Sequence, residues 1–106
     1  HLQLAGKVKT WIDEHPDFEM LTPPTLNLLC FRYHPSGIAS EDELNRLNEE
    51  LLHRINETGE IYMTHTKLNG KYTLRMVVAQ THVEERHVQE AWKLILKTAG
   101  NLAVNG

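Results

Sequence analysis

The dipeptide Asn69-Gly70 lies between two runs of alternating residues, and this pattern predicts a β-hairpin. Both residues tolerate the positive φ angles of a type I′ turn, which sets Leu68 opposite Lys71. With that register, the pairing should continue as far as Ile61 opposite Val78. One face of the hairpin is then apolar and carries Ile61, Met63, Leu74, Met76 and Val78. The other face is polar and carries Thr64, Thr66, Thr73 and Arg75.

The first third of the chain predicts a helix followed by two strands. Apolar residues recur at helical spacing from Leu4 to Ile12, and Pro16 ends that helix. A short strand is expected at 18–21, and a second at 26–33 should lie in the centre of a sheet because both of its faces are largely apolar. No N-cap residue precedes the first helix, so we expect the chain to be a fragment of a longer protein.

A helix is also predicted in the middle of the chain. Ser40 with Glu43 forms a capping-box pattern, and Gly59 suits the left-handed residue that ends a helix. The expected apolar stripe consists of Leu44, Leu47, Leu51 and Ile55.

A last helix is predicted after the hairpin. Thr81 with Glu84 is a second capping box, and the helix should end near Gly100. The remaining residues, 101–106, are expected to fray. The expected apolar stripe consists of Val88, Ala91, Trp92 and Ile95.

The predicted order of elements is helix, strand, strand, helix, hairpin, helix. That order suits an α+β fold, in which a small antiparallel sheet of about four strands packs with three helices. A length of 106 residues fits a single domain spanning 1–106. Hydrophobic residues make up 41% and charged residues 24%, which is ordinary for a globular protein and argues against disorder.

Charge and hydropathy exclude several partners. The formal net charge is -3 and the 11 Lys and Arg residues are scattered, so no nucleic-acid surface is expected. The longest apolar runs, at 28–31 and 76–79, are too short to cross a bilayer, so no membrane contact is expected. The single cysteine, Cys30, cannot form an internal disulfide, which is consistent with a cytoplasmic protein.

Residues that bind metals or cofactors show no recognisable pattern. The seven histidines lack the spacing of a helical metal site, so no metal is expected. Glu84 and Glu85 are better explained as helix-capping residues than as a catalytic pair, and we expect no catalytic residue here. The glycines are single and widely spaced, and no lysine lies in a context that predicts a buried amine. We therefore expect this chain to bind no cofactor.

Arg75 is the most unusual residue by position, because it interrupts an otherwise largely apolar strand. Two interpretations stay open. In the first, Arg75 is a solvated or ion-paired strand residue. In the second, its guanidinium group anchors a carboxylate or a neighbouring domain. Thr64, Thr66 and Thr73 share its predicted face and are candidate supporting residues at the same surface.

Five stretches carry a resemblance to a known family: His-Pro-Asp-Phe-Glu at 15–19, Leu-Asn-Leu-Leu-Cys-Phe-Arg-Tyr at 26–33, Leu-Asn-Glu-Glu-Leu-Leu at 47–52, the hairpin, and Glu-Glu-Arg-His-Val at 84–88. Together they resemble the carboxy-terminal small domain of pyridoxal-phosphate-dependent (group II, aromatic-L-amino-acid type) amino-acid decarboxylases. The resemblance implies the aspartate-aminotransferase fold, in which this domain closes on a large domain that holds the cofactor.

The resemblance also implies a function for a longer parent chain. Such enzymes are homodimers that release carbon dioxide and an amine, and their pyridoxal 5'-phosphate is bound to a lysine of the large domain. The cofactor motifs of the family match no position here, so the fragment alone is expected to be inactive. Leu-Arg-Met at 74–76 matches a Leu-Arg-Phe pattern whose arginine lies near the domain interface and the mobile active-site loop. This match implies that Arg75 and its threonine neighbours face the large domain.

Two other classes of function remain open on the sequence. A free-standing ferredoxin-like ligand-binding or regulatory module has the same order of strand, helix, hairpin and helix. A dimerisation or scaffold unit is the third class.

Overall fold

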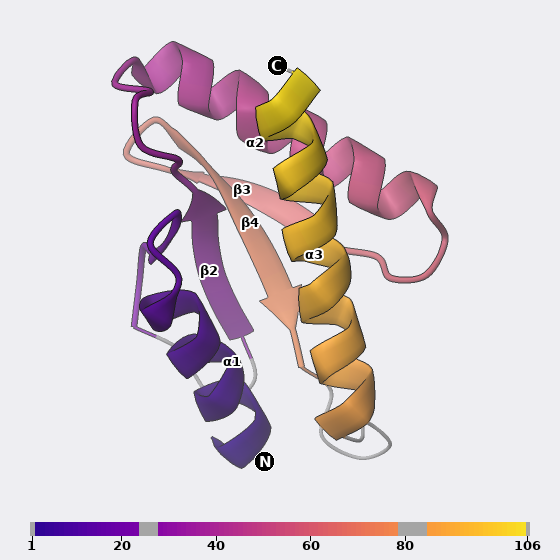
Figure 1. Cartoon of the computed structure of the whole chain (residues 1–106). Coiled ribbons are helices and arrows are strands. Elements are labelled where there is room, and N and C mark those ends of the chain that lie inside the picture. The colour runs from indigo at the N-terminus through magenta and orange to yellow at the C-terminus, as the bar shows by residue number, and fades with distance from the viewer. Residues whose placement is uncertain (1, 24–27, 79–84, 106) are drawn as a thin grey trace.

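The computed structural model of the chain describes residues 2–23, 28–78 and 85–105 (Figure 1). The elements follow in the order α1 (Leu2–Glu14), β1 (Phe18–Met20), β2 (Leu28–Tyr33), α2 (Glu41–Glu57), β3 (Thr64–Leu68), β4 (Lys71–Val77) and α3 (Glu85–Asn105). The strands form one sheet in the order β1-β2-β4-β3, and all neighbours are antiparallel. The predicted α+β fold is therefore confirmed, as is the central position of β2.

The hairpin has the predicted turn and register near its tip. Asn69 and Gly70 have φ angles of 52° and 80°, as a type I′ turn requires. The pairs run from Leu68 with Lys71 to Thr64 with Arg75. The prediction that the pairing extends to Ile61 is wrong. The reason is that Met63 exchanges two backbone hydrogen bonds, at 2.8 and 2.9 Å, with the side-chain amide of Asn56 instead of with β4.

One face of the sheet, here called the inner face, is covered by the helices. Figure 1 shows α1 and α3 lying on the same side of the strands. Side chains of this face that are buried in the core are Phe18, Leu29, Phe31, Tyr33, Tyr72, Leu74 and Met76. The helices contribute Val8 and Ile12 from α1, Leu51 and Ile55 from α2, and Val88, Trp92 and Ile95 from α3. Burial of this apolar surface is the main force that holds the helices on the sheet.

Helix α2 begins and ends as the sequence predicts. The Ser40 hydroxyl accepts a hydrogen bond from the Glu43 N–H at 3.3 Å, and Gly59 has a φ of 74° just beyond the helix. The buried stripe differs from the expected one, because it also includes Leu52 and Asn48. Asn48 is fully buried, whereas Leu47 only packs at the edge of the core.

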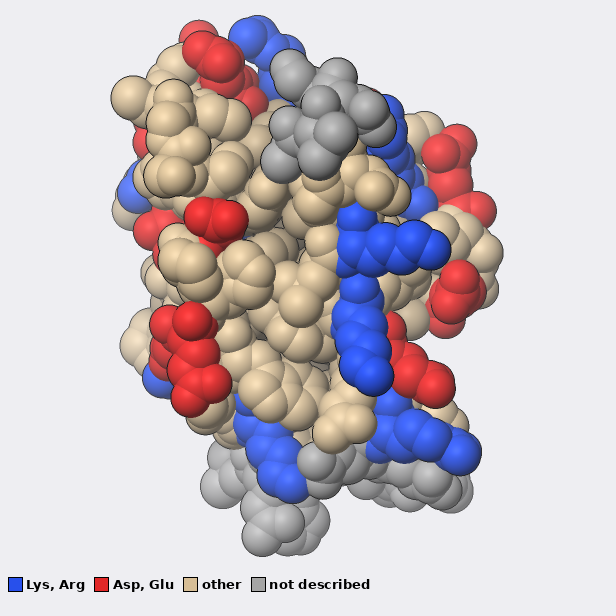
Figure 2. Space-filling view, viewed as in Figure 1, with Lys and Arg blue, Asp and Glu red and all other residues tan. Residues whose placement is uncertain are grey.

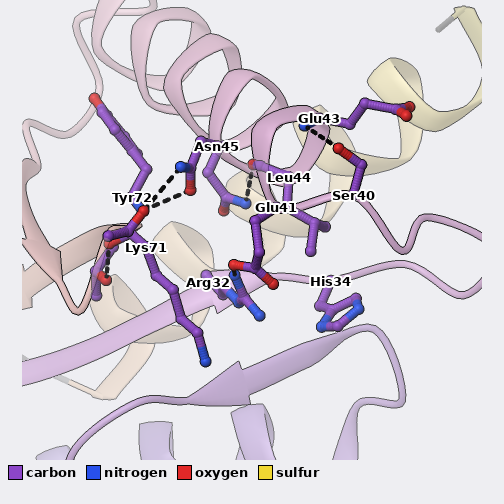
Figure 3. Close-up of polar contacts among 12 residues, drawn as sticks. Arg32, His34, Ser40, Glu41, Glu43, Leu44, Asn45, Lys71 and Tyr72 are labelled. Atoms are coloured by element: carbon purple, nitrogen blue, oxygen red, sulfur yellow. Dashed lines mark hydrogen bonds and ion pairs between the residues drawn. The ribbon is translucent and has the colours of Figure 1, made fainter.

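Asn48 and Asn45 bond the backbone where β2 and β4 separate. The ladder between these strands stops at Phe31 opposite Leu74, and two residues further its register would place Tyr33 opposite Tyr72. Instead, the Tyr33 N–H and C=O bond the Asn48 side chain at 2.8 and 2.9 Å. The Tyr72 N–H donates to Asn45 Oδ1 at 2.8 Å (Figure 3). Helix α2 thus satisfies backbone groups that the sheet leaves unpaired.

Helix α3 is longer than predicted. It continues through Gly100 to Asn105, so the expected end near Gly100 is wrong, as is the expected fraying of residues 101–105. Residue 106 lies outside the described residues. The physical reason is that Ala99 and Leu102 extend the apolar stripe of Ile95 by one more turn and are buried. The predicted cap at Thr81 with Glu84 and the predicted first residues of the strand at 26–33 lie outside the described residues.

Candidate functional site

The face of the sheet opposite the helices, here called the outer face, holds the residues singled out from the sequence. The strand register assigns to it Glu19 from β1, Leu28, Cys30 and Arg32 from β2, Thr64, Thr66 and Leu68 from β3, and Lys71, Thr73, Arg75 and Val77 from β4. Val77 is 61% exposed, and Leu28 and Leu68 are half-buried. The outer face is therefore partly open, with an apolar end at Leu28 and Val77 and a polar centre.

The structure brings the four predicted site residues together at that centre. Thr64 lies opposite Arg75, and Thr66 lies opposite Thr73. Thr64 is exposed, and Thr66 and Arg75 are half-buried. Thr73 differs from the other three because it is fully buried, and its hydroxyl donates to the Lys71 carbonyl at 2.9 Å. Thr64, Thr66 and Arg75 can therefore contact another molecule, whereas Thr73 supports the strand.

Arg75 has unused hydrogen-bonding capacity. Its guanidinium forms neither an ion pair nor a hydrogen bond with another residue of the described parts of the chain. A guanidinium offers five N–H donors in a planar fork that matches a carboxylate or phosphate. The ladder places Cys30 opposite Arg75 on β2, so the cation sits over the middle of the sheet. Chemically, this arrangement can hold an anionic group that approaches the outer face.

An ionic network around the buried Arg32 borders the outer face near α2 (Figure 3). The Arg32 side chain is only 4% exposed and contacts two carboxylates, Glu19 at 2.5 Å and Glu41 at 3.0 Å. Glu19 also lies 3.0 Å from Nδ1 of His34. The network links β1, β2 and the first turn of α2. Such charge-assisted contacts position segments because each ion requires its partner.

The network shifts the pKa values of its members toward the charged forms. Partial burial raises the pKa of Glu19, but hydrogen bonds and positive charge from Arg32 and His34 lower it by more. Burial likewise lowers the pKa of Arg32, and its bonds to Glu41 and Glu19 raise it by more. The hydrogen bond from Arg32 is the main cause of a lowered pKa at Glu41. All three groups are therefore ionised near neutral pH.

The roles of Arg32, Asn45 and Asn48 were not predicted from the sequence. Arg32 could have been found, because it is a charge in a strand whose other residues predict burial on both faces. A buried arginine of this kind needs an acidic partner, and Glu19 and Glu41 were candidates. The two asparagines carried no such signal, because asparagine in a helix usually faces solvent.

The described residues do not form a recognisable metal or cofactor site. Within residues 2–23, 28–78 and 85–105, no group of three or more His, Cys, Asp or Glu side chains is placed to hold a metal ion. Lys7, Lys67, Lys93 and Lys97 are exposed, so none has the buried amine that cofactor attachment needs. In the same described parts, no helix is both long and apolar enough to cross a membrane. The expectations that the chain binds neither metal nor cofactor stay predictions.

The chain is similar in sequence to curated plant enzymes. It is 40% identical over 105 residues to tyrosine decarboxylase 2 of Arabidopsis thaliana, covering 99% of this chain and 19% of that protein. It is 42% identical over 98 residues to a tryptophan decarboxylase of Camptotheca acuminata, covering 92% of this chain and 20% of that protein. A phenylacetaldehyde synthase of Arabidopsis thaliana is 39% identical over 102 residues, or 96% of this chain and 21% of the enzyme. No protein-family profile matches the chain.

Solved structures show the same fold. The tryptophan decarboxylase of Catharanthus roseus in complex with L-tryptophan superimposes with a TM-score of 0.86 and 35% identity, over 95% of this chain and 21% of that one. The Oryza sativa enzyme "TDC with PLP and tryptamine" gives a TM-score of 0.89 and 33% identity, over 95% of this chain and 22% of that one.

The three helices on a four-stranded antiparallel sheet are thus the fold of the carboxy-terminal domain of pyridoxal-phosphate-dependent decarboxylases. This fold defines the class of the domain, which the sequence resemblance predicted. Within that class, the chain is homologous to the plant aromatic L-amino-acid decarboxylases and spans about a fifth of their length. The resemblance stated from the sequence is confirmed.

Proposed function

We propose that the chain is the small carboxy-terminal domain of a decarboxylase that converts an aromatic amino acid into an amine and carbon dioxide. The observation that carries this proposal is the similarity to plant decarboxylases along nearly the whole chain. The remaining four fifths of such a protein supplies the cofactor and the reacting groups. When bound there, pyridoxal 5'-phosphate supplies the electron sink for the electrons of the departing carboxylate.

The role of this domain in the proposal is to support and close the active site from its outer face. The partly exposed Leu28 and Val77 offer an apolar contact, and Arg75 offers an unpaired cation next to Thr64. A large-domain surface with a protruding apolar side chain and an acidic group would complement both the apolar contact and the cation. The ionic network around the buried Arg32 links β1 and α2 beside that contact.

A second reaction outcome is favoured by one specific observation. The phenylacetaldehyde synthase is 39% identical to this chain and the tyrosine decarboxylase 40%, so the small domain does not discriminate between them. In that second case the parent enzyme consumes dioxygen and water, and it releases the aldehyde, carbon dioxide, ammonia and hydrogen peroxide instead of an amine. We also propose that the parent enzyme is a homodimer in the cytoplasm.

The test is an assay of the full-length protein that contains this segment. Purified enzyme with pyridoxal 5'-phosphate is incubated with L-tyrosine, L-tryptophan or L-phenylalanine, and carbon dioxide, amine and aldehyde are measured separately. Equimolar amine and carbon dioxide would support the decarboxylase, and equimolar aldehyde and carbon dioxide would support the synthase. Absence of carbon dioxide release from all three would contradict both. Light scattering of the same sample tests the homodimer.

A further inference from the structure

A groove between α1 and α3 lies on the helical side of the domain, away from the outer face. It is a shallow groove, open to solvent, with a volume of about 280 Å³, and it is lined by Trp11, Glu14, His15, Gln89, Trp92 and Lys93. A volume just below the usual range of ligand pockets suits one small molecule better than a drug-sized ligand. The proposed function assigns no role to this groove, because it concerns the opposite side of the sheet.

The floor of the groove is aromatic and held in place by the core. Trp92 is 8% exposed, and its ring packs edge-on against Phe18 at 5.1 Å and Phe31 at 6.3 Å between centroids. His15 reaches across from the end of α1 to Trp92 at 6.4 Å. Trp11 is half-buried and adds a second indole. A rigid aromatic wall binds another ring at low entropic cost.

The rims of the groove carry opposite charges. Glu14 is exposed on α1, and Lys93 is exposed on α3. Neither forms an ion pair with a residue in the described parts of the chain, whereas the nearby Asp13 is already paired with Lys9. On the side of the domain drawn in Figure 2, acidic side chains lie on the left, a column of basic side chains lies on the right, and mostly neutral surface lies between them.

We propose that this groove binds a free aromatic α-amino acid as its zwitterion. The ring would lie against Trp11 and Trp92, the ammonium group beside Glu14 and the carboxylate beside Lys93. This ligand is the class of molecule that offers a cation, an anion and an apolar ring within the size of the groove. An amine that has lost its carboxylate would leave Lys93 without a partner. The site would therefore distinguish an amino acid from its decarboxylated product.

The chain itself provides the reporter for a test. Its two tryptophans both line the groove, so the two indole N–H signals of a ¹⁵N-labelled sample report on this place, and Trp11→Phe assigns them. L-phenylalanine is added up to about 50 mM, well above the millimolar Kd expected of a shallow site. We expect saturable shifts of both signals. Phenethylamine, 3-phenylpropanoate and L-alanine each lack one feature of the ligand and should bind several-fold more weakly.

Two pairs of variants separate the site from non-specific effects. Glu14→Gln and Lys93→Gln should each weaken L-phenylalanine binding about 3- to 5-fold, the range expected for partly exposed ion pairs. Glu49→Gln on α2 and Lys67→Gln on β3 change the same residue types at exposed positions that do not line the groove, and both should leave binding unaltered. All four positions are exposed, so the variants should fold.

Three results would overturn the proposal. The first is the lack of a saturable shift with L-phenylalanine. The second is equal binding of phenethylamine, which would show that the carboxylate is not recognised. The third is a shift of the indole signals with protein concentration alone, which would show that a second copy of the chain occupies the groove. None of these results depends on the activity of the full-length enzyme.

Discussion

Asn48 hydrogen-bonds both backbone groups of Tyr33. It accepts from the Tyr33 N–H at 2.8 Å and donates to the Tyr33 carbonyl at 2.9 Å, while a second N–H of the same amide donates to Leu44 at 2.9 Å. A primary amide can do this because it carries an acceptor and two donors. The contact joins α2 to the central strand at the point where that strand leaves the ladder.

The first prediction follows from this contact. Asn48→Leu should lower the free energy of unfolding by about 2–4 kcal/mol, because two buried backbone groups lose their partners and each costs about 1–3 kcal/mol. Urea denaturation of the isolated chain measures the change. Asn101→Leu, at an exposed position of α3, is the matched control and should stay within about 0.5 kcal/mol of the parent. If Asn48→Leu lowered the unfolding free energy only slightly, water would have taken over the hydrogen bonds of the Asn48 amide.

The ionic network of Arg32, Glu19 and Glu41 should make the stability of the domain depend on pH. The lowered pKa of Glu19 and Glu41 means that the unfolded chain binds more protons than the folded chain as the pH falls below about 4.5. Their stabilisation is therefore full above that pH and is lost as the pH drops through the lowered values. Between about pH 5 and 3, the unfolding free energy should therefore fall by about 1 kcal/mol less in Glu19→Gln than in the parent. The effect is this small because the Glu19 side chain is 39% exposed and solvent screens its ion pairs.

Denaturant titrations at several pH values test this. Glu60→Gln is the control, because Glu60 is exposed in the loop after α2 and lies outside the network. A steep acid transition retained in Glu19→Gln would show that other carboxylates set the acid stability of the domain.

Local signals predicted most of the fold. The Asn69-Gly70 turn fixed the pairing of Thr66 with Thr73 because only one register is compatible with a two-residue type I′ loop. The cap at Ser40 fixed the start of α2 for a similar local reason. Even the ferredoxin-like alternative had a physical basis, since β2, α2, β3 and β4 form a split βαβ unit.

The predictions that proved wrong have a common cause: contacts with residues elsewhere in the chain outweigh the local sequence signal. Met63 was expected in the hairpin, but the Asn56 side chain takes its backbone groups. Gly100 was expected to stop a helix, but burial of Leu102 continues it. For the candidate site, the register placed Arg75 with Thr64 on one face. The burial of Thr73 could not be predicted, because it depends on how neighbouring side chains fold over it.

Replacement of Arg75 should have different effects in the isolated chain and in the full-length enzyme. In the isolated chain, Arg75→Ala should change the unfolding free energy by less than about 0.5 kcal/mol, because the guanidinium has no partner in the described residues. In the full-length enzyme, the same change should reduce kcat/KM about tenfold, as expected for loss of one charged hydrogen bond across the domain interface. Arg75→Lys should recover only part of the loss, because lysine lacks the fork.

Steady-state kinetics and thermal melting of the full-length variants provide the measurements. Lys67→Ala lies on β3 and faces the other side of the hairpin, so it serves as the control. Unchanged kinetics of Arg75→Ala would refute the proposed contact.

A side chain at Gly70, in the turn of the hairpin, should strain the backbone without causing a steric clash. Gly70 has a φ of 80°, and a Cβ atom added there would meet nothing within 4 Å. Gly70→Ala should therefore cost only the strain of the left-handed backbone, about 1–2 kcal/mol. Gly6→Ala, in the exposed part of α1 with equal free space, should instead stabilise by up to about 1 kcal/mol. Equal effects of the two changes would mean that the turn relaxes to another type.

The length of α3 can be tested at Gly100. This glycine lies inside the helix, is exposed, and has free space where a Cβ would stand. Gly100→Ala should raise the unfolding free energy by about 0.5–1 kcal/mol, because alanine is the better helix former. If the helix instead ended at a left-handed Gly100, alanine would destabilise the domain by a similar amount. The sign of the change, read from urea denaturation followed by circular dichroism, therefore decides whether burial of Leu102 overrides the local stop signal.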